Sequence, residues 1–174
     1  MFHHQSAPDV ADLPTGAYLV RRKLSSLEGY LVDNSTGARV YHFKGHLTFP
    51  GQRWSMLDAT GAELAALVRP PLHIHPTFTV SRPGRRDVVI RKAGFAPVLE
   101  SWRIEGAEDG DIDLRGDMLN HEFTFERDGQ VIGTTTRRWI SVTDAYAVQA
   151  SGIDPVLAIA ASVGIDSVEQ EHNH

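Results

Sequence analysis

Apolar and polar residues alternate along most of this chain. Phe123 and Phe125 are separated by one polar residue, and so are Trp102 and Ile104. A period of two is typical of a β-strand with one face in the core and the other in water. The pattern predicts about twelve strands, near residues 17–22, 29–33, 38–43, 53–58, 63–68, 77–81, 87–92, 97–105, 111–115, 121–127, 130–138 and 145–150.

Glycine-containing turns separate these strands at a nearly constant interval. Gly37, Gly61, Gly84, Gly106 and Gly129 follow one another at separations of 24, 23, 22 and 23 residues. Each turn contains Asp, Asn, Pro or Gly, the residue types that supply positive φ angles and side-chain hydrogen bonds in turns. One turn per period indicates a repeated β-hairpin.

A segment near the end of the chain has a different pattern. Asp154 suits a helix N-cap and Pro155 the first helical position, and residues 156–165 are apolar or small on every side. A helix without a polar face must be buried all round. An antiparallel sheet of many strands exposes two edges unless it closes. We therefore expect a mainly β protein, a closed antiparallel barrel of about twelve strands around this central C-terminal helix.

Length and composition limit the class of protein. The 174 residues suit one domain, and we expect a barrel at residues 15–168 between flexible tails at 1–14 and 169–174. A net charge of −5 argues against a nucleic-acid partner, and the absence of cysteine excludes disulfides and thiolate chemistry. Because no signal segment is visible and the helix is too short to span a membrane, we expect a cytoplasmic protein.

Several motifs occur in a characteristic order along the chain. They are residues 30–37 (YLVDNSTG), 54–61 (WSMLDATG), 114–117 (LRGD), 128–131 (DGQV), 138–141 (RWIS) and 144–146 (DAY), followed by the apolar helix. In this order they resemble the LURP-one-related family of the tubby C-terminal-like superfamily. The resemblance covers about residues 17–168 and implies a twelve-stranded antiparallel barrel around a central helix.

The resemblance is less specific about function. Tubby domains are phosphoinositide-binding modules, phospholipid scramblases are similar in fold, and plant relatives are linked to defence. No segment matches the phosphoinositide-binding residues of tubby, and we find no hydrolase, phosphate-loop or dinucleotide-binding motif. We expect a non-enzymatic binding module without a cofactor, contacting an anionic phospholipid at the membrane periphery or a protein partner. The alternatives are a scaffold, a scramblase-like lipid-handling protein and, less favoured, a metal-dependent enzyme.

Basic residues around one turn are the sequence's main candidate for ligand binding. They could converge on a phosphate, whereas the structural alternative is a set of solvated charges on turns and strand edges. Residues 21–23 and 137–138 form two further basic runs, and the three tryptophans are expected in the core or at the barrel rim. The candidate anion-binding residues are Arg82, Arg85, Arg86, Arg91 and Lys92.

Two histidines form a weak candidate metal site. His73 and His75 would share a face of a strand, as a pair of metal ligands requires. No third ligand lies nearby in the sequence, and Pro70, Pro71 and Pro76 favour a loop. We therefore expect no bound metal and read this stretch as a proline-rich surface loop.

Overall fold

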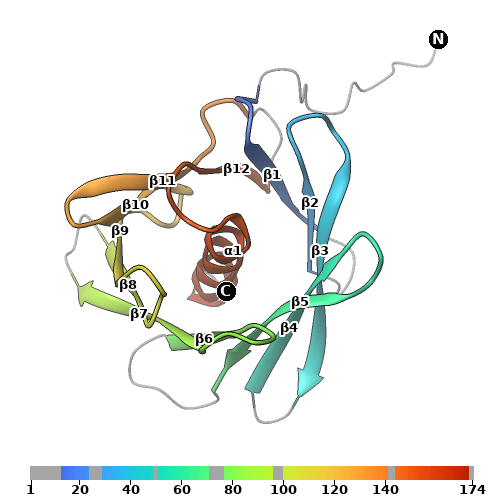
Figure 1. The fold of residues 1–174 in the computed structure, drawn as a ribbon, viewed down its shortest axis with the longest axis horizontal. Helices are drawn as coiled ribbons and strands as arrows, with labels where there is room; N and C mark the ends of the chain where they lie inside the picture. Colours follow the sequence, from blue (N-terminus) through green and yellow to red (C-terminus); the bar gives the residue numbers. More distant parts are fainter. Residues whose placement is uncertain are drawn as a thin grey trace.

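The computed structural model describes residues 13–23, 29–48, 51–70, 77–95, 100–140 and 144–172. Within these residues, twelve antiparallel strands form a closed barrel around one helix (Figure 1). The elements are β1 (Ala17–Arg22), β2 (Tyr30–Asp33), β3 (Arg39–Thr48), β4 (Gly51–Asp58), β5 (Glu63–Arg69), β6 (Thr77–Ser81), β7 (Val88–Phe95), β8 (Glu100–Glu105), β9 (Ile112–Asp117), β10 (Glu122–Arg127), β11 (Gln130–Thr136), β12 (Ala145–Ala150) and α1 (Pro155–His172).

The barrel closes between its first and last strands. Each strand pairs with its neighbours in sequence, and β1 completes the ring by pairing antiparallel with β12, with Ala17 opposite Gln149 and Val20 opposite Tyr146. Closure leaves no sheet edge in the ring with unpaired backbone groups that could recruit another strand. The predicted closed antiparallel barrel is confirmed.

The alternation seen in the sequence separates the inner and outer faces of the wall. Phe123 and Phe125 of β10 and Trp102 and Ile104 of β8 are buried, with between 0% and 3% of each residue exposed. The intervening Thr124 is half-buried and lies on the outer face. The inner residues supply the apolar lining that encloses α1.

Two hairpin turns of similar sequence close in the same way. The Oδ1 atom of Asn34 accepts hydrogen bonds from the backbone amides of Thr36 and Ala38, at 3.0 Å each. Asp58 makes the equivalent contacts in the DATG turn, and the glycine of each turn, Gly37 and Gly61, has a φ of 88°. In both hairpins the side-chain hydrogen bonds stabilise the tight turn between the strands.

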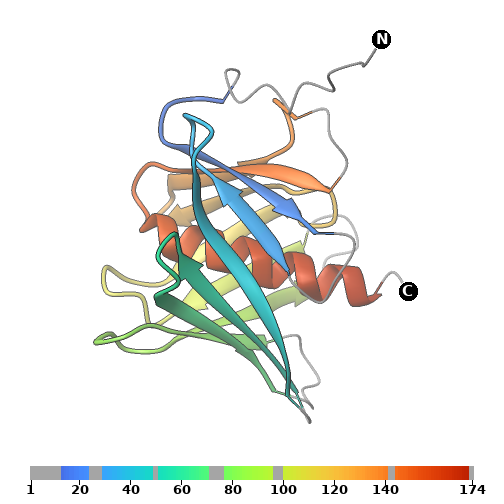
Figure 2. The same ribbon diagram turned by 90° about the vertical axis from the view of Figure 1, so that its right-hand side faces the viewer.

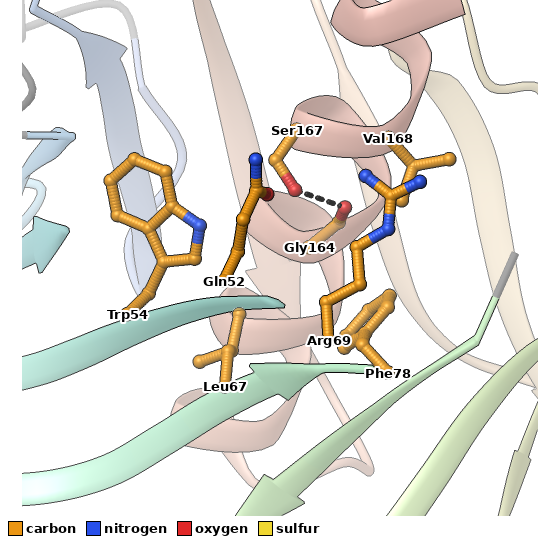
Figure 3. A pocket seen from close by; sticks show the side chains of 8 residues that line it. All are labelled: Gln52, Trp54, Leu67, Arg69, Phe78, Gly164, Ser167 and Val168. Atoms are coloured by element: carbon orange, nitrogen blue, oxygen red, sulfur yellow. Dashed lines mark hydrogen bonds between the residues drawn. The ribbon is translucent and has the colours of Figure 1, made fainter. Parts of the chain in front are cut away.

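The helix fills the interior of the barrel. Every residue from 157 to 166 is buried, and Figure 2 shows α1 running through the ring of strands. A narrow slot beside its second half has a volume of about 10 Å³, room for little more than one water molecule. The slot is lined by Gln52, Trp54, Leu67, Arg69, Phe78, Gly164, Ser167 and Val168 (Figure 3). In the described residues, the interior is therefore a packed core.

The helix is longer than expected. We expected it to end near Ile165 and a flexible tail to begin at residue 169, but α1 continues to His172, and Glu169 is buried. The added turns contain Val168, which is 1% exposed, and a Glu-Gln-Glu run of good helix formers, so packing and propensity both extend the helix. No helix in the described part of the chain has the length and apolar character needed to span a membrane.

Several strand boundaries also differ from expectation. β3 reaches Thr48 instead of residue 43, because it pairs with β4 from Tyr41 to Thr48. β8 is described from Glu100 onward, and the expected start at residue 97 lies outside the described residues. β11 ends at Thr136, two residues before the expected end at residue 138. The chain there enters a turn in which the Ile140 amide donates to the Arg137 carbonyl at 2.9 Å.

Candidate functional site

The turn between β6 and β7 that carries Arg82, Arg85 and Arg86, which we call the arginine turn, contacts the beginning of the central helix. The Arg82 guanidinium lies 2.6 Å from Oδ2 of Asp154, and the Arg85 guanidinium lies 3.1 Å from the same oxygen. The Arg82 side chain is only 7% exposed. The other oxygen of Asp154 accepts the Val156 amide at 3.0 Å, which is an N-cap hydrogen bond. These two arginines thus hold the helix start against the barrel wall.

The other three residues of the predicted anion site are dispersed. Arg91 donates from Nε to Glu105 at 2.8 Å, and Lys92, as the next residue of β7, lies on the opposite face of the strand. Arg86 is exposed in the turn. The structure therefore brings Arg82 and Arg85 together on one carboxylate and gives Arg91 a separate carboxylate. An anion-binding role for the five residues stays a prediction.

The histidine pair lies outside the described residues. These two residues are His73 and His75. Among the residues that the structure describes, no group of three or more His, Cys, Asp or Glu side chains is arranged to hold a metal ion.

A groove on the outer wall of the barrel has the dimensions of a ligand site. Its volume is about 480 Å³, within the range of roughly 300–1,000 Å³ that small-molecule sites occupy. Strand register places a row of polar residues across it, because Thr124 lies opposite Arg115 on one side and Thr134 on the other, and Thr134 lies opposite Gln149. We call this the outer-wall groove; it is lined by Arg115, Glu122, Phe123, Thr124, Thr134, Thr135, Thr136, Arg138, Trp139 and Gln149.

One wall of the outer-wall groove is a turn held in place by a carboxylate. The Glu122 carboxylate accepts the Thr136 hydroxyl at 2.7 Å and the Arg137 amide at 2.8 Å. The Thr136 hydroxyl oxygen in turn accepts the Arg138 amide at 3.1 Å. Arg138 and Trp139 are the central residues of this turn, so a hydrogen-bonded support fixes the backbone that presents them to the groove.

The two arginines of the groove have guanidinium groups that are accessible to a ligand. Arg115 has a side chain that is 70% exposed, and its ion pair with Glu126 is loose, at 3.8 Å between Nε and Oε2. Arg138 is exposed, and its guanidinium forms no ion pair with a residue that the structure describes. Exposed guanidinium groups bind carboxylates and phosphates through paired, directional hydrogen bonds. The groove is therefore suited to an anionic ligand.

A buried polar cluster lies inside the barrel. Asp166 of α1 accepts the Tyr30 hydroxyl at 2.7 Å and lies 3.2 Å from Nε2 of His121, whose ring stacks on Tyr146 at a centroid distance of 4.4 Å. Burial, reinforced by Asp166, raises the pKa of Tyr30 well above its ordinary value. Burial lowers the pKa of His121, and Arg137 and Arg22 add to this, while Asp166 and Asp144 oppose it. The cluster ties the helix to β2 and to the β9–β10 turn.

A serine on the outer face has hydrogen-bond partners that resemble those of a nucleophile. The Ser55 hydroxyl donates to Glu63 at 2.7 Å and lies 3.0 Å from Nε2 of His46. In a hydrolytic triad the histidine lies between the serine and the carboxylate, whereas here the serine lies between them. In this order the carboxylate contacts the serine and does not orient the histidine, so we interpret the three residues as a hydrogen-bonded link between β3, β4 and β5.

Comparison with models of known families decides the classification. Residues 17–166 match the model of the LURP-one-related family. The chain belongs to the LURP-one-related family. The family resemblance derived from the order of motifs is therefore confirmed.

The LURP-one-related chain is also similar to a solved structure. That structure is an X-ray structure of an Arabidopsis thaliana protein, with a TM-score of 0.62 and 12% sequence identity, over 92% of this chain and 96% of that chain. At this identity the likeness shows the fold alone. A comparison with curated proteins found no match.

Sequence reasoning identified only part of the groove of this LURP-one-related protein. It noted Arg138 as part of a basic run and Trp139 as a residue of the core or rim, but did not connect them with Arg115. The row of floor residues spans four strands, and its register depends on a bulge between Phe125 and Glu126. The outward-facing polar positions on these strands could have indicated a polar surface. The bulge that aligns them into one row has no distinct sequence pattern.

Proposed function

We propose that this LURP-one-related protein is a non-enzymatic binding module that recognises an anionic group in its outer-wall groove. The observation that carries the proposal is the pairing of two accessible guanidinium groups, Arg115 and Arg138, with a half-buried tryptophan in a groove of about 480 Å³. The packed interior adds support, because α1 occupies the space in which many barrels bind a ligand.

The proposal moves the anion site away from the arginine turn. Arg82 and Arg85 are committed to Asp154, so an anion there would compete with an existing ion pair. An anion that binds Arg138 would displace no ion pair with a residue that the structure describes. The anionic group can belong to a phospholipid head group at a membrane surface or to a soluble molecule, and both supply an oxyanion to the same guanidinium groups.

The test compares two pairs of arginines in one assay. The full chain is sedimented with phosphatidylcholine vesicles and with vesicles that also contain phosphatidylserine or phosphoinositide, and its melting temperature is measured with soluble carboxylates and phosphates. The double variant Arg115→Ala/Arg138→Ala should lose binding to the anionic probe by tenfold or more, because each charged hydrogen bond contributes about 1.5–3 kcal/mol. The matched control Arg85→Ala/Arg86→Ala should keep it.

Three outcomes separate the interpretations. Salt-sensitive binding to anionic vesicles assigns the group to a lipid, and a thermal shift with a soluble anion alone assigns it to a soluble ligand. Loss of binding only in the Arg85→Ala/Arg86→Ala variant would return the site to the arginine turn and overturn the groove assignment. Failure of every anionic probe to bind would overturn the proposed function and leave a protein partner as the better explanation.

A further inference from the structure

We infer that the ligand of the outer-wall groove is an acidic saccharide, a sugar ring that carries a carboxylate. This inference rests on the proposed function, because it specifies the chemistry of the same anionic ligand. It follows from three features of the groove: the polar groups on its floor, the tryptophan on its wall and its small net charge.

The floor of the groove presents groups that match sugar hydroxyls. Thr124 and Thr134 lie on adjacent strands in register, and Gln149 continues the row on β12. All three are half-buried and line the groove. A threonine hydroxyl both donates and accepts, and the glutamine amide offers a carbonyl oxygen and an NH₂ group. Such groups can each pair with a ligand hydroxyl, which also donates and accepts.

The wall of the groove adds an aromatic surface. Trp139 lines the groove and is half-buried, so part of its side chain remains accessible. An indole combines a large apolar face with a polar N–H. The C–H face of a sugar ring can pack on such a surface while the ring hydroxyls reach the polar floor.

The charge of the groove favours a ligand with a single negative charge. Among the residues that line it, Arg115 and Arg138 contribute two positive charges and Glu122 one negative charge, while Glu126, outside the lining, contacts Arg115 only at 3.8 Å. A carboxylate would balance the resulting single positive charge. A ligand with several phosphates would place excess negative charge beside the Glu122 carboxylate, which is unfavourable at short range.

The supporting turn prepares the site before the ligand arrives. Glu122 already holds the Thr136 hydroxyl and the Arg137 amide, and Thr136 holds the Arg138 amide. A pre-organised site loses less conformational entropy when it binds a ligand. We therefore assign Glu122 as a positioning residue and Arg138 as the residue that pairs with the carboxylate of the sugar.

The test is a calorimetric titration of the full chain with three soluble probes. They are an acidic trisaccharide of two galactose units and one galacturonic acid unit, which carries a single carboxylate, the neutral galactose trisaccharide of the same size, and inorganic phosphate. The acidic trisaccharide should bind at least tenfold more tightly than either of the others, because it alone supplies both the carboxylate and the hydroxylated ring. Two variants, Arg138→Ala and Trp139→Ala, should each weaken its binding by about tenfold.

Further variants test the hydroxyl on the groove floor and provide a control outside the groove. Thr134→Val preserves the shape of the side chain and removes its hydroxyl, so it should weaken the acidic trisaccharide but leave phosphate unaffected. The control Arg86→Ala changes an exposed arginine outside the groove and should leave every affinity unchanged. Melting temperatures of all variants establish that the comparison is made on folded protein.

The outcomes distinguish this inference from the proposed function. Equal or tighter binding of phosphate, lost in Arg138→Ala, would overturn the saccharide assignment and leave the anion-binding function intact. Equal binding of the neutral trisaccharide would overturn the role of the carboxylate. No binding of any soluble anion or anionic vesicle would overturn both. Tight binding of the acidic trisaccharide that Arg138→Ala and Trp139→Ala leave unchanged would overturn the location.

Discussion

Gly164 is a residue at which the central helix lies very close to the wall of the barrel. A Cβ atom at this position would overlap the ring of Phe78, a buried residue of β6 (Figure 3). Glycine in the middle of a helix normally costs about 1 kcal/mol relative to alanine. Its presence here is explained by the close approach, which sets how tightly the strands can enclose α1.

Gly164→Ala should therefore destabilise the protein although it improves helix propensity. Overpacking against Phe78 should lower the free energy of unfolding by about 1–3 kcal/mol, which urea denaturation would measure. In the double variant Gly164→Ala/Phe78→Leu, the smaller side chain on β6 should recover part of the loss. A stability equal to or above that of the wild type in the single variant would contradict the packing argument.

The arginine turn shows where sequence reasoning about single residues fails. Its residues were identified as a group, but their partner Asp154 lies 72 positions from Arg82 and 69 from Arg85 in the chain. The sequence predicts Asp154 as the helix N-cap, and its hydrogen bond from the Val156 amide confirms this. What the pattern could not show was that the same carboxylate has a second role, because that contact exists only once the barrel has closed around the helix.

At the scale of the element, the start of α1 combines a cap with an ion pair. Asp154 accepts the Val156 amide with one oxygen and pairs with Arg82 and Arg85 through the other. Because the Arg82 side chain is almost fully buried, removal of its partner would leave a charge in a poorly solvated place. The element is thus fixed at its N-terminal end by one side chain.

Two substitutions of Asp154 separate the contribution of the N-cap hydrogen bond from that of the ion pair. Asp154→Ala should lower the free energy of unfolding by about 3 kcal/mol, since it removes the cap and leaves Arg82 without its carboxylate. Asp154→Asn keeps a good capping group and removes only the charge, so it should be about 1 kcal/mol less damaging than alanine. Chemical denaturation of the two variants would measure the difference. Equal losses would show that the cap contributes nothing here.

The elements were predicted with different success. Strand alternation and the glycine turns placed the hairpins, because both depend on local residues such as Gly37 and Gly61. The helix was expected to end too early, because Asp166 interrupts the apolar pattern. In the folded protein Tyr30 and His121 contact that carboxylate inside the barrel. An apparent boundary in the sequence was thus a buried polar contact within the helix.

At the scale of the whole molecule, the buried polar cluster links stability to pH. An unfolded histidine has a pKa near 6.5, and burial lowers the pKa of His121 in the folded protein. Between the two pKa values the unfolded chain binds more protons than the folded protein. The contribution of neutral His121 to stability is therefore fully present above about pH 6.5 and declines as the pH falls below it.

The expected result is a loss of stability on mild acidification, measured as the urea midpoint between pH 8 and 5. The matched control is His121→Asn, because asparagine tolerates the positive φ of 56° at this position and does not titrate. Its midpoint should be lower at pH 8 but should change less between pH 7 and 5. Parallel pH profiles for the two proteins would contradict the assignment to His121.

The position of α1 in the chain has a consequence for how this protein is made. The twelve strands that the structure describes precede the helix in the sequence, yet their inner faces pack on it. During translation the apolar sides of the strands therefore emerge before the helix on which they pack. The ring can close only after β12 has been synthesised, because β1 pairs with it. Folding of such a chain is delayed until after synthesis of the helix, with unpaired strand edges exposed in the meantime. We expect the nascent chain to depend on chaperones to a degree that the finished, edgeless barrel does not reveal.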